Sequence, residues 1–319
     1  MSNPNESLFQ PKVSIVIPVY NGADFMREAI DSALAQTYRN IEVLVINDGS
    51  RDDGATREVA ISYGDRIRYF EKENGGVSSA LNLGIRNMTG EYFSWLSHDD
   101  VYLPDKVQKS VACLGSLPDR ERVIAFCGSS HINIRSEVIR EEVERFDHGR
   151  VYTGEEVLLY LLQNHMMNMC CMLIPRKTFE ECELFHEGLR YNQDALMLYR
   201  IFSTGHSMVA HTDDRMVRYR LHANQTSKTR RDLLLHDSNV AAEIIAPVFA
   251  SLNTKKINFL RLYAGHHAKQ ACKEALNTCI RIGKRMRALG FWDIVALRMK
   301  LIWGYIRGVL KKIYHAIRF

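Results

Sequence analysis

Short apolar runs alternate with helical patterns along the first third of the chain. Continuous runs rich in Val and Ile are typical of central parallel strands, which are buried on both faces. The runs that we interpret as strands are residues 13–19, 41–48, 67–72 and 91–97, and the helical patterns between them cover residues 24–36, 52–63 and 75–88. This alternation predicts an α/β fold with a mostly parallel central sheet flanked by helices.

Polar residues follow each of the predicted strands. The four clusters are Tyr20–Gly22, Asp48–Ser50, Asn74–Gly76 and Ser97–Asp100. Because ligands bind outside the carboxyl ends of parallel strands, we expect these clusters to converge on one binding edge. The chain has neither a GxGxxG fingerprint nor a P-loop, which argues against a dinucleotide-dependent dehydrogenase and a P-loop enzyme.

The segment EYFSWLSHDD, residues 91–100, ends in two adjacent carboxylates. Its aromatic beginning is typical of a buried strand. At the tip of such a strand Asp99 and Asp100 would repel each other and lose hydration. A divalent cation would make the pair tolerable. The alternative is an ordinary turn, since Asp is common where strands end.

Three motifs resemble the nucleotide-binding half of family 2 glycosyltransferases, which have the GT-A fold. They are IVIPVYNG, VINDGSRDD and ENGGVSSALNLGIRNMTGEYFSWLSHDDVYLPDK. The similarity is dense over residues 12–110 and sparser to about residue 226. It implies inverting transfer of a sugar from a nucleotide sugar, usually UDP-linked, to a hydroxyl group of an acceptor.

The resemblance also implies a division of the chain. The expected parts are a flexible N-terminus (1–10), a GT-A domain (11–226) with a nucleotide-sugar-binding half (11–110) and an acceptor half (111–226), and a helical, basic C-terminal extension (227–319).

Donor-binding positions follow from the resemblance. In this family the acid that ends the second strand hydrogen-bonds the donor's base, and here that residue is Asp48. A carboxylate that accepts the imide N–H of uracil would make a charge-assisted hydrogen bond. The alternative for Asp48 is the N-cap of a helix. The other positions that the resemblance assigns to the donor are Pro18, Tyr20, Asn21, Gly76 and Asp99, the last of them on the ribose.

The metal site departs from the family pattern at one position. The usual Asp-Ser-Asp-Asp is Ser97-His98-Asp99-Asp100 here, so the first acid is absent. The resemblance implies that Asp100 binds Mn²⁺ or Mg²⁺, which would stabilise the departing diphosphate. Many relatives carry a histidine that completes the metal shell at the position of His222, and neutral imidazole is a good Mn²⁺ ligand. The alternative is a structural or solvated His222. His98 is expected to point away from Ser97 and Asp99.

The second half carries the expected catalytic base. We interpret residues 123–134 as a strand and residues 153–163 as a helix, and in the segment 215–227 a strand that ends at His222. In GLRYNQDALMLYRI, residues 188–201, Gln193-Asp194 matches the family's Glu-Asp pair at the start of a helix, so Asp194 would deprotonate the acceptor hydroxyl. Without the resemblance, Asp194 would be an acid that favours the helix dipole. The chain lacks the Gln-x-x-Arg-Trp segment of processive synthases, which favours transfer of one sugar per encounter.

The charge of the chain is unevenly distributed. Residues 255–319 contain fifteen Lys and Arg against Glu274 and Asp293, a balance of +13, so the remainder carries −8 of the total of +5. Such a basic tail suggests an anionic partner. On a helical wheel one face of the last segment is apolar, consisting of Phe291, Val295, Ile302, Ile306, Val309, Ile313 and Ala316. The opposite face consists of Asp293, Lys300, Arg307, Lys311 and Arg318, and Trp292 and Trp303 lie near the boundary.

This pattern favours the surface of an anionic membrane. The alternative is that the apolar face packs on the catalytic domain. No nucleic-acid partner is expected, because no binding motif accompanies the charge. The polar N-terminus, the lack of a stretch approaching the ~20 apolar residues of a membrane span and the absence of metal-like cysteine spacings predict a cytoplasmic protein, peripheral on the inner face of the membrane.

We therefore expect a metal-dependent, non-processive glycosyltransferase that acts on a glycan or lipid-linked glycan. Two alternatives belong to other classes. One is a catalytically impaired homologue that binds sugar nucleotides, suggested by Ser97 and Gln193. The other is a membrane-surface adaptor that acts through the basic tail.

Overall fold

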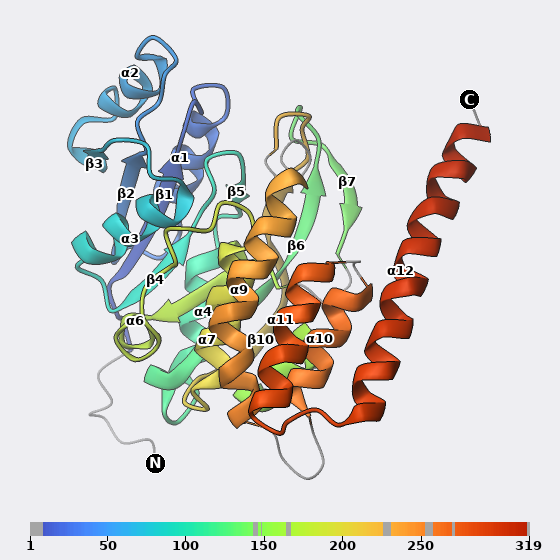
Figure 1. Ribbon diagram of the computed structural model, residues 1–319. Helices are drawn as coiled ribbons and strands as arrows, with labels where there is room; N and C mark the ends of the chain where they lie inside the picture. Colours follow the sequence, from blue (N-terminus) through green and yellow to red (C-terminus); the bar gives the residue numbers. More distant parts are fainter. Residues whose placement is uncertain are drawn as a thin grey trace. The chain divides into compact units, whose positions relative to one another are not determined.

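The computed structural model describes residues 9–142, 146–147, 149–163, 167–225, 231–252, 258–269 and 272–317 (Figure 1). Within these ranges only the backbone is described for residues 213, 231–232, 269, 291 and 308–317. Of the predicted flexible N-terminus, residues 1–8 lie outside the described residues. Phe9 packs edge-on against Tyr92, with ring centroids 6.0 Å apart.

The chain divides into two compact units. The sheet unit comprises Met1–Gly154, Met167–Gly188 and Thr204–Gln225, and the helical unit comprises Glu155–Met166, Leu189–Ser203 and Thr226–Phe319. The sheet unit ends at Gln225, next to the domain boundary expected at residue 226. Two segments of the expected GT-A domain, 155–166 and 189–203, belong to the helical unit.

Ten strands of the described chain form one sheet in the order β3-β2-β1-β4-β9-β6-β10-β5, with β7 beside β6 and β8 beside β10. They are β1 (Val13–Val19), β2 (Ile41–Asn47), β3 (Arg68–Glu71), β4 (Tyr92–Trp95), β5 (Val101–Tyr102), β6 (Val123–Ile132), β7 (Val138–Glu141), β8 (Val151–Tyr152), β9 (Met172–Pro175) and β10 (Met208–Arg220). The long pairings are parallel, and the short ones, including those of β9, are antiparallel. The predicted α/β fold is confirmed.

β1 lies in the middle of the parallel half and is buried along its whole length, as its run of Val and Ile requires. Pro18 lies inside this strand, although proline cannot donate a ladder hydrogen bond. Val16 faces β4, since its carbonyl accepts from the N–H of Leu96, and Pro18 faces the same side. Because the β1–β4 register ends at Val16 and Trp95, no strand needs a donor from Pro18.

Helices cover the parallel strands of the sheet unit. They are α1 (Met26–Leu34), α2 (Ala55–Ile61), α3 (Val77–Asn87), α4 (Lys106–Gly115) and α6 (Arg176–Cys182), with short 3₁₀ turns η1 (Gly64–Arg66), η2 (Arg120–Arg122) and η3 (Met169–Cys171). Gly84 brings α3 close to β1, because a Cβ at this position would lie only 2.4 Å from Cγ1 of Val16. Close packing of α3 in turn fixes the loop that precedes it.

The helical unit consists of α5 (Gly154–Leu162), α7 (Gln193–Ser203), α9 (Arg231–Ser251), α10 (Phe259–Lys269), α11 (Lys273–Arg285) and α12 (Phe291–Ile317). Figure 1 shows α9, α10 and α11 packed against one another and α12 beside α10. Tyr199, Phe249 and Tyr263 form its aromatic centre, with edge-on ring contacts of 5.2 to 5.5 Å between centroids.

One described helix is long and apolar enough to cross a membrane by length and composition, contrary to the expectation from the sequence. It is the Leu233–Ser251 part of α9, with a mean hydropathy of 1.3. Ala242, Ile245 and Phe249 of this helix are fully buried in the helical unit. Its apolar composition is therefore accounted for by packing against α7, α10 and α11.

Candidate active site

The carboxyl ends of β3, β2, β1 and β4 lie side by side, so the polar segments that follow them meet at one edge of the sheet, as predicted (Figure 1). Asn21 follows β1 in the left-handed region, with φ of 49°. Its side-chain oxygen accepts a hydrogen bond of 2.7 Å from the N–H of Arg51, and its own N–H donates to the Ser50 hydroxyl at 2.9 Å. The loops after β1 and β2 are thereby joined, while Tyr20 stays 43% exposed beside them.

Asp48 follows β2 and organises the loop before α3. Its Oδ1 accepts from the N–H of Gly75 at 2.9 Å, and its Oδ2 accepts from the N–H of Gly76 at 2.7 Å. The Lys72 ammonium donates to Oδ1 at 2.8 Å. A carboxylate has about four acceptor positions, so one on Oδ2 stays available. The predicted contact with the donor's base stays a prediction. The bonds to Gly75 and Gly76 precede Val77, the first residue of α3, so Asp48 holds the loop before this helix and does not act as its N-cap.

Gly49 makes this arrangement possible. Its φ of 68° is left-handed, and a Cβ would lie 2.6 Å from the backbone nitrogen of Asn74. The side-chain amide of Asn74 donates to the carbonyl of Asp48 at 2.9 Å. A glycine is therefore required here, both for its backbone conformation and for the approach of the two loops.

The carboxylates after β4 have different surroundings. Nε2 of His222 lies 2.9 Å from Oδ2 of Asp99, and both side chains are mostly buried. Burial raises the pKa of Asp99, but the hydrogen bond with His222 and the charge of His98 together hold its pKa below the ordinary value. Asp100 is fully buried, and both burial and the neighbouring Asp99 raise its pKa well above the ordinary value.

Only one of the two carboxylate oxygens of Asp100 has a hydrogen-bond partner among the described residues. Its Oδ1 accepts from the N–H of Arg220 at 2.9 Å. Its Oδ2 is buried near the Cys170 thiol and has no hydrogen-bond partner within bonding distance among the described residues. A buried carboxylate oxygen of this kind is costly without a donor or a cation. The orphaned oxygen therefore marks this turn as a place for a positive group.

Arg220, the last residue of β10, stabilises the turn that contains Asp99 and Asp100. Its fully buried guanidinium donates through Nε to the carbonyl of Asp99 at 2.8 Å and through Nη1 to the carbonyl of Asn133 at 3.1 Å. Nη2 pairs with Glu28 of α1 at 2.5 Å. The guanidinium also lies 4.7 Å from the ring centroid of Phe25. One side chain thus ties the carboxylate turn to α1, β6 and β10.

The strand predicted from residue 215 to His222 was placed too late in the chain. β10 runs from Met208 to Arg220, so His222 lies two residues beyond its end. There the ring of His222 lies 5.2 Å from that of Phe25 between centroids, and its backbone N–H donates to Gln225 at 3.3 Å. A histidine in a loop, rather than in a ladder, is free to turn toward Asp99.

Ser97 and His98 make contacts of their own beside the carboxylate pair. The Ser97 hydroxyl lies 3.4 Å from the sulfur of Cys170. The ring of His98 lies against Gly22, where a Cβ would come within 2.4 Å of its Cδ2. The expected orientation of His98, away from Ser97 and Asp99, stays a prediction.

The side chains at the carboxylate turn supply part of the ligand set of a divalent cation. Among the described residues no three His, Cys, Asp or Glu side chains converge as a full set of protein ligands. A cation such as Mg²⁺ commonly takes only one or two carboxylates and completes its shell with substrate phosphates. The Asp99–His222 pair and the orphaned Oδ2 of Asp100 meet that requirement. His222 lies beside Asp99 and not beside Asp100, so the expected division of Asp100 on the metal and Asp99 on the ribose stays a prediction.

Asp194 belongs to the helical unit, as the second residue of α7. Its Oδ1 accepts a 2.7 Å hydrogen bond from the N–H of Ala195. Burial raises the pKa of Asp194, which is the direction expected for a general base. The neighbouring Gln193 has a buried side-chain oxygen with no partner among the described residues. The catalytic role of Asp194 stays a prediction.

Asp237 of α9 holds the loop that precedes α7, and sequence analysis did not identify it. Its buried Oδ2 accepts from the N–H groups of Arg190, Tyr191 and Asn192 at 2.8, 2.6 and 3.3 Å. These three residues directly precede Gln193, the first residue of α7. Asp237 thus holds the loop before α7 from another helix. Lys72 and Arg220 were missed in the same way, because only the folded chain brings them to their partners.

The comparisons with known proteins agree with this geometry. The chain belongs to glycosyl transferase family 2, whose model matches residues 14–182, and it is a glycosyltransferase. An uncharacterized glycosyltransferase of Rickettsia prowazekii (strain Madrid E) is 44% identical over 226 residues, which are 70% of this chain and 68% of that protein. A relative from Rickettsia felis is 46% identical over 223 residues, but these cover only 36% of its length.

Solved structures show that the fold is GT-A, as the resemblance implied. S. aureus TarS 1–349 in complex with UDP-GlcNAc matches with a TM-score of 0.66 at 15% identity, over 92% of this chain and 89% of that one. The mannosyltransferase PcManGT from Pyrobaculum calidifontis, in complex with GDP-Man and Mn²⁺, matches with a TM-score of 0.51 at 18% identity, over 94% of this chain and 85% of that one. At these identities the likeness concerns the fold alone.

Proposed function

We propose that the protein is an inverting, metal-dependent, non-processive glycosyltransferase that moves a sugar from a UDP-linked donor to a hydroxyl group of a glycan or lipid-linked glycan. The observation that carries the proposal is the carboxylate turn after β4. Asp99, paired with His222, and the half-satisfied Asp100 lie next to the loops that follow β1 and β2. The UDP-GlcNAc complex of TarS supports the choice of donor class.

The donor would lie along the edge formed by these loops. Asp48 keeps one acceptor position on Oδ2 for the imide N–H of uracil. The backbone of Gly76, together with the side chains of Tyr20 and Asn21, borders the same position. Pro18 is buried within β1, so its part is to shape the strand end that carries these residues.

Asp100 and His222 remain the residues that we assign to the metal. Because His222 lies beside Asp99, we add Asp99 to the metal side of the site, beside its expected role on the ribose. A bound Mn²⁺ or Mg²⁺ would stabilise the diphosphate as it leaves. The pKa of Asp99 lies below the ordinary value, so this carboxylate is charged and ready to bind a cation at neutral pH. His222 in its neutral form would supply the nitrogen ligand.

Asp194 would accept the proton of the acceptor hydroxyl as the hydroxyl attacks the anomeric carbon. Its raised pKa makes it a stronger base than an ordinary aspartate. Because the attack comes from the face opposite the leaving diphosphate, one displacement inverts the anomeric centre.

We also propose that the protein acts on the cytoplasmic face of the membrane, without a nucleic-acid partner. All seven cysteines carry thiols and no disulfide joins them in the structure, which supports a reducing compartment. The grouping of basic residues after residue 255 supports an anionic surface as the partner.

Release of UDP from a panel of UDP-sugars tests the proposal. In the presence of Mn²⁺ the wild-type protein should release UDP from at least one donor, and a chelator should abolish the release. Asp194→Asn should lower turnover by at least ~10²-fold, the range expected for loss of a general base, while leaving donor affinity nearly unchanged. Glu58→Gln, an exposed change on α2, is the matched control.

Two outcomes would contradict the proposal. Tight UDP binding with no release from any donor would identify a catalytically impaired homologue, which the unusual Ser97 and Gln193 would explain. A protein that binds neither UDP nor a UDP-sugar would leave the basic tail as the functional part, as in a membrane-surface adaptor.

A further inference from the structure

α12 packs on α10 through the face opposite its apolar one. Leu297 is 1% exposed and lies over Gly265 of α10, where a Cβ would be 3.9 Å from its Cδ2. Asp293 pairs with Arg261 of α10 at 3.0 Å and accepts from the N–H of Gly290 at 3.0 Å. The face centred on Leu297 is therefore the one that anchors α12 to the helical unit.

The outward face of α12 is apolar. Its exposed side chains, with their exposed fractions, are Trp292 (78%), Val295 (37%), Met299 (53%), Ile302 (51%), Trp303 (62%) and Ile306 (42%). At 100° per residue they share an arc of roughly 100°, the width of a typical apolar stripe. The described members of the predicted apolar face are thus exposed rather than packed. Among the other predicted members of the two faces, the side chains of Phe291, Val309, Lys311, Ile313 and Ala316, and the whole of Arg318, lie outside the described residues.

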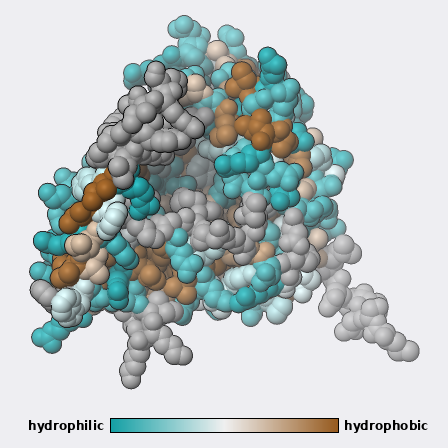
Figure 2. Space-filling view, turned by 90° about the vertical axis from the view of Figure 1, so that its right-hand side faces the viewer, coloured by the Kyte–Doolittle hydropathy of each residue, from teal (hydrophilic) through white to brown (hydrophobic). Residues whose placement is uncertain are grey.

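Cations border this apolar face on both sides. On the helical wheel Arg298 lies at one edge, and Lys300 and Arg307 lie at the other, and all three side chains are exposed. Figure 2 shows hydrophobic side chains exposed among hydrophilic ones on the face turned to the viewer. An apolar stripe with cations at both edges is the pattern of a helix that lies in a membrane interface.

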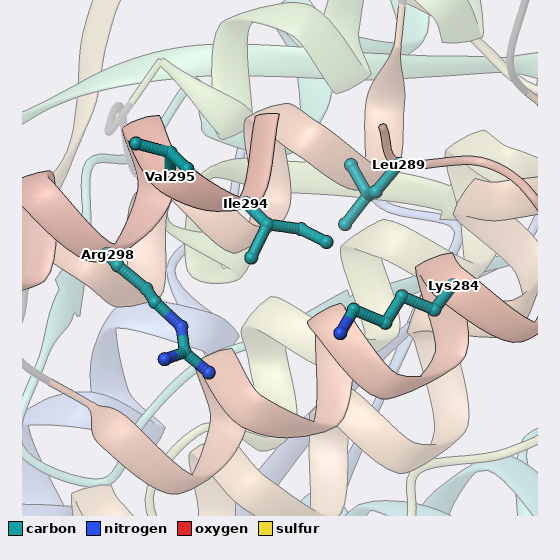
Figure 3. A pocket seen from close by; sticks show the side chains of 5 residues that line it. All are labelled: Lys284, Leu289, Ile294, Val295 and Arg298. Carbon is teal, nitrogen blue, oxygen red and sulfur yellow. The ribbon is translucent and has the colours of Figure 1, made fainter. Parts of the chain in front are cut away.

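A crevice of about 450 Å³ adjoins the same face, between α11 and α12. Leu289, Ile294 and Val295 form its apolar lining. Figure 3 shows Lys284 of α11 and Arg298 of α12 extending their nitrogen atoms toward the same space. Neither cation has a carboxylate partner among the described residues, whereas Arg281, one turn before Lys284, is paired with Glu243. Lys284 and Arg298, which have no carboxylate partner there, and the apolar lining of the crevice suit the phosphate and the upper acyl chain of an anionic lipid.

We propose that α12 lies in the surface of an anionic bilayer, with its outward apolar face among the acyl chains and a lipid phosphate between Lys284 and Arg298. Charge complementarity selects this occupant, because the chain after residue 255 has a balance of +13 and each cation near such a surface adds about 1 kcal/mol of attraction. Sugar transfer is not a premise of this proposal, so the proposed transferase activity and the bilayer contact of α12 can fail separately.

Sedimentation of the full chain with vesicles tests the proposal. Vesicles of phosphatidylcholine containing 30% phosphatidylglycerol should bring the protein down, and vesicles of phosphatidylcholine alone should bind it much less. The double variant Lys284→Gln/Arg298→Gln should bind the anionic vesicles roughly 30-fold more weakly, which is the fold-change that corresponds to two cations at about 1 kcal/mol each. Ile302→Ser/Ile306→Ser should also weaken binding, and this loss should persist at low salt.

Two matched controls separate a bilayer site from a general effect of charge. Lys273→Gln/Arg281→Gln removes the same charge from α11 at positions away from the crevice, and it should bind within a few-fold of wild type. Circular dichroism and sedimentation without vesicles establish that each variant is folded and does not aggregate. Equal binding by the crevice variant and its control would overturn the lipid site, and failure of the wild-type protein to bind anionic vesicles would overturn the membrane surface itself.

Discussion

The buried guanidinium of Arg220 distributes its donors among the carbonyls of Asp99 and Asn133 and the carboxylate of Glu28. At the scale of a single residue, Arg220 holds Asp99 and Asp100 in one turn although the two carboxylates repel each other. Asp48 has a similar role with a negative charge, because its two carboxylate oxygens accept hydrogen bonds from the N–H groups of Gly75 and Gly76. Charged side chains therefore hold the backbone of the candidate site through hydrogen bonds. As a result, the acids near the proposed donor position are fixed before any ligand binds.

Replacing Arg220 by Met should destabilise the fold. Met keeps most of the apolar stem but leaves the carbonyl of Asp99 without its donor and Glu28 without its cation, while the carbonyl of Asn133 keeps only the N–H of Ser136. A buried acceptor without a partner costs ~1–3 kcal/mol. We expect a loss of at least ~2 kcal/mol in the free energy of unfolding, measured by urea denaturation. Arg135→Met, an exposed change of the same kind, should stay within ~0.5 kcal/mol. Equal stabilities would mean that water replaces the guanidinium without cost.

The pH dependence of turnover should report Asp194. A general base acts in its deprotonated form, and burial raises the pKa of Asp194 above the ordinary value of 3.8. Activity is therefore full above the raised pKa and falls as the pH drops through it. With donor and Mn²⁺ saturating, kcat reports the enzyme–substrate complex. An acidic limb at or below 3.8 would contradict the burial of this carboxyl or its role.

At the scale of secondary structure, the apolar runs located most elements to within a few residues. The strand at residues 13–19 was predicted at its observed bounds, and the helix predicted over residues 153–163 is observed as Gly154–Leu162. Buried parallel strands are recognised easily, because both of their faces must be apolar. The late placement of β10 has a physical cause, since register shifts near Arg215 interrupt its alternation.

What the sequence could not predict depends on contacts between distant residues. Lys72, Arg220 and Asp237 look like surface charges in the sequence, but Arg220 and Asp237 are almost fully buried. Each of the three is satisfied by partners at least 24 residues away. The carboxylate turn and the candidate base were found because their motifs are local. The three residues that support them were not found, because their hydrogen-bond partners are distant in the sequence and only the fold brings them together.

The contact between Asp237 and the loop before α7 should matter for turnover rather than for donor binding. Asp237→Asn removes the negative charge from the one oxygen, Oδ2, that accepts all three backbone N–H groups, so the loop before α7 should loosen and Asp194 should lose its fixed position. We expect a kcat about 10-fold lower with an unchanged Kd for UDP, because a misplaced base slows only the chemical step. Glu243→Gln, on the same helix but bonded to α11, is the control. A weaker Kd for UDP with unchanged kcat would place the effect of Asp237 elsewhere.

At the scale of the whole molecule, the two units have different tasks. The sheet unit carries the carboxylate turn and the loops that we assign to the donor, whereas the helical unit carries Asp194 and the basic, partly apolar α12. The charge division of the chain follows this separation, with the balance of +13 after residue 255. The proposed donor edge and the proposed membrane contact of α12 would together suit an enzyme whose acceptor is held at a membrane.

Calorimetric titration of UDP with and without Mn²⁺ tests the central claim most directly. The wild-type protein should bind UDP at least ~10-fold more tightly with Mn²⁺, in line with the ~10–100-fold range for metal-site changes. Asp99→Asn and His222→Ala should remove that gain, and the exposed change Asp65→Asn should keep it. A UDP affinity that does not depend on Mn²⁺, or that survives both substitutions, would contradict a metal-dependent donor site at the Asp99–His222 pair.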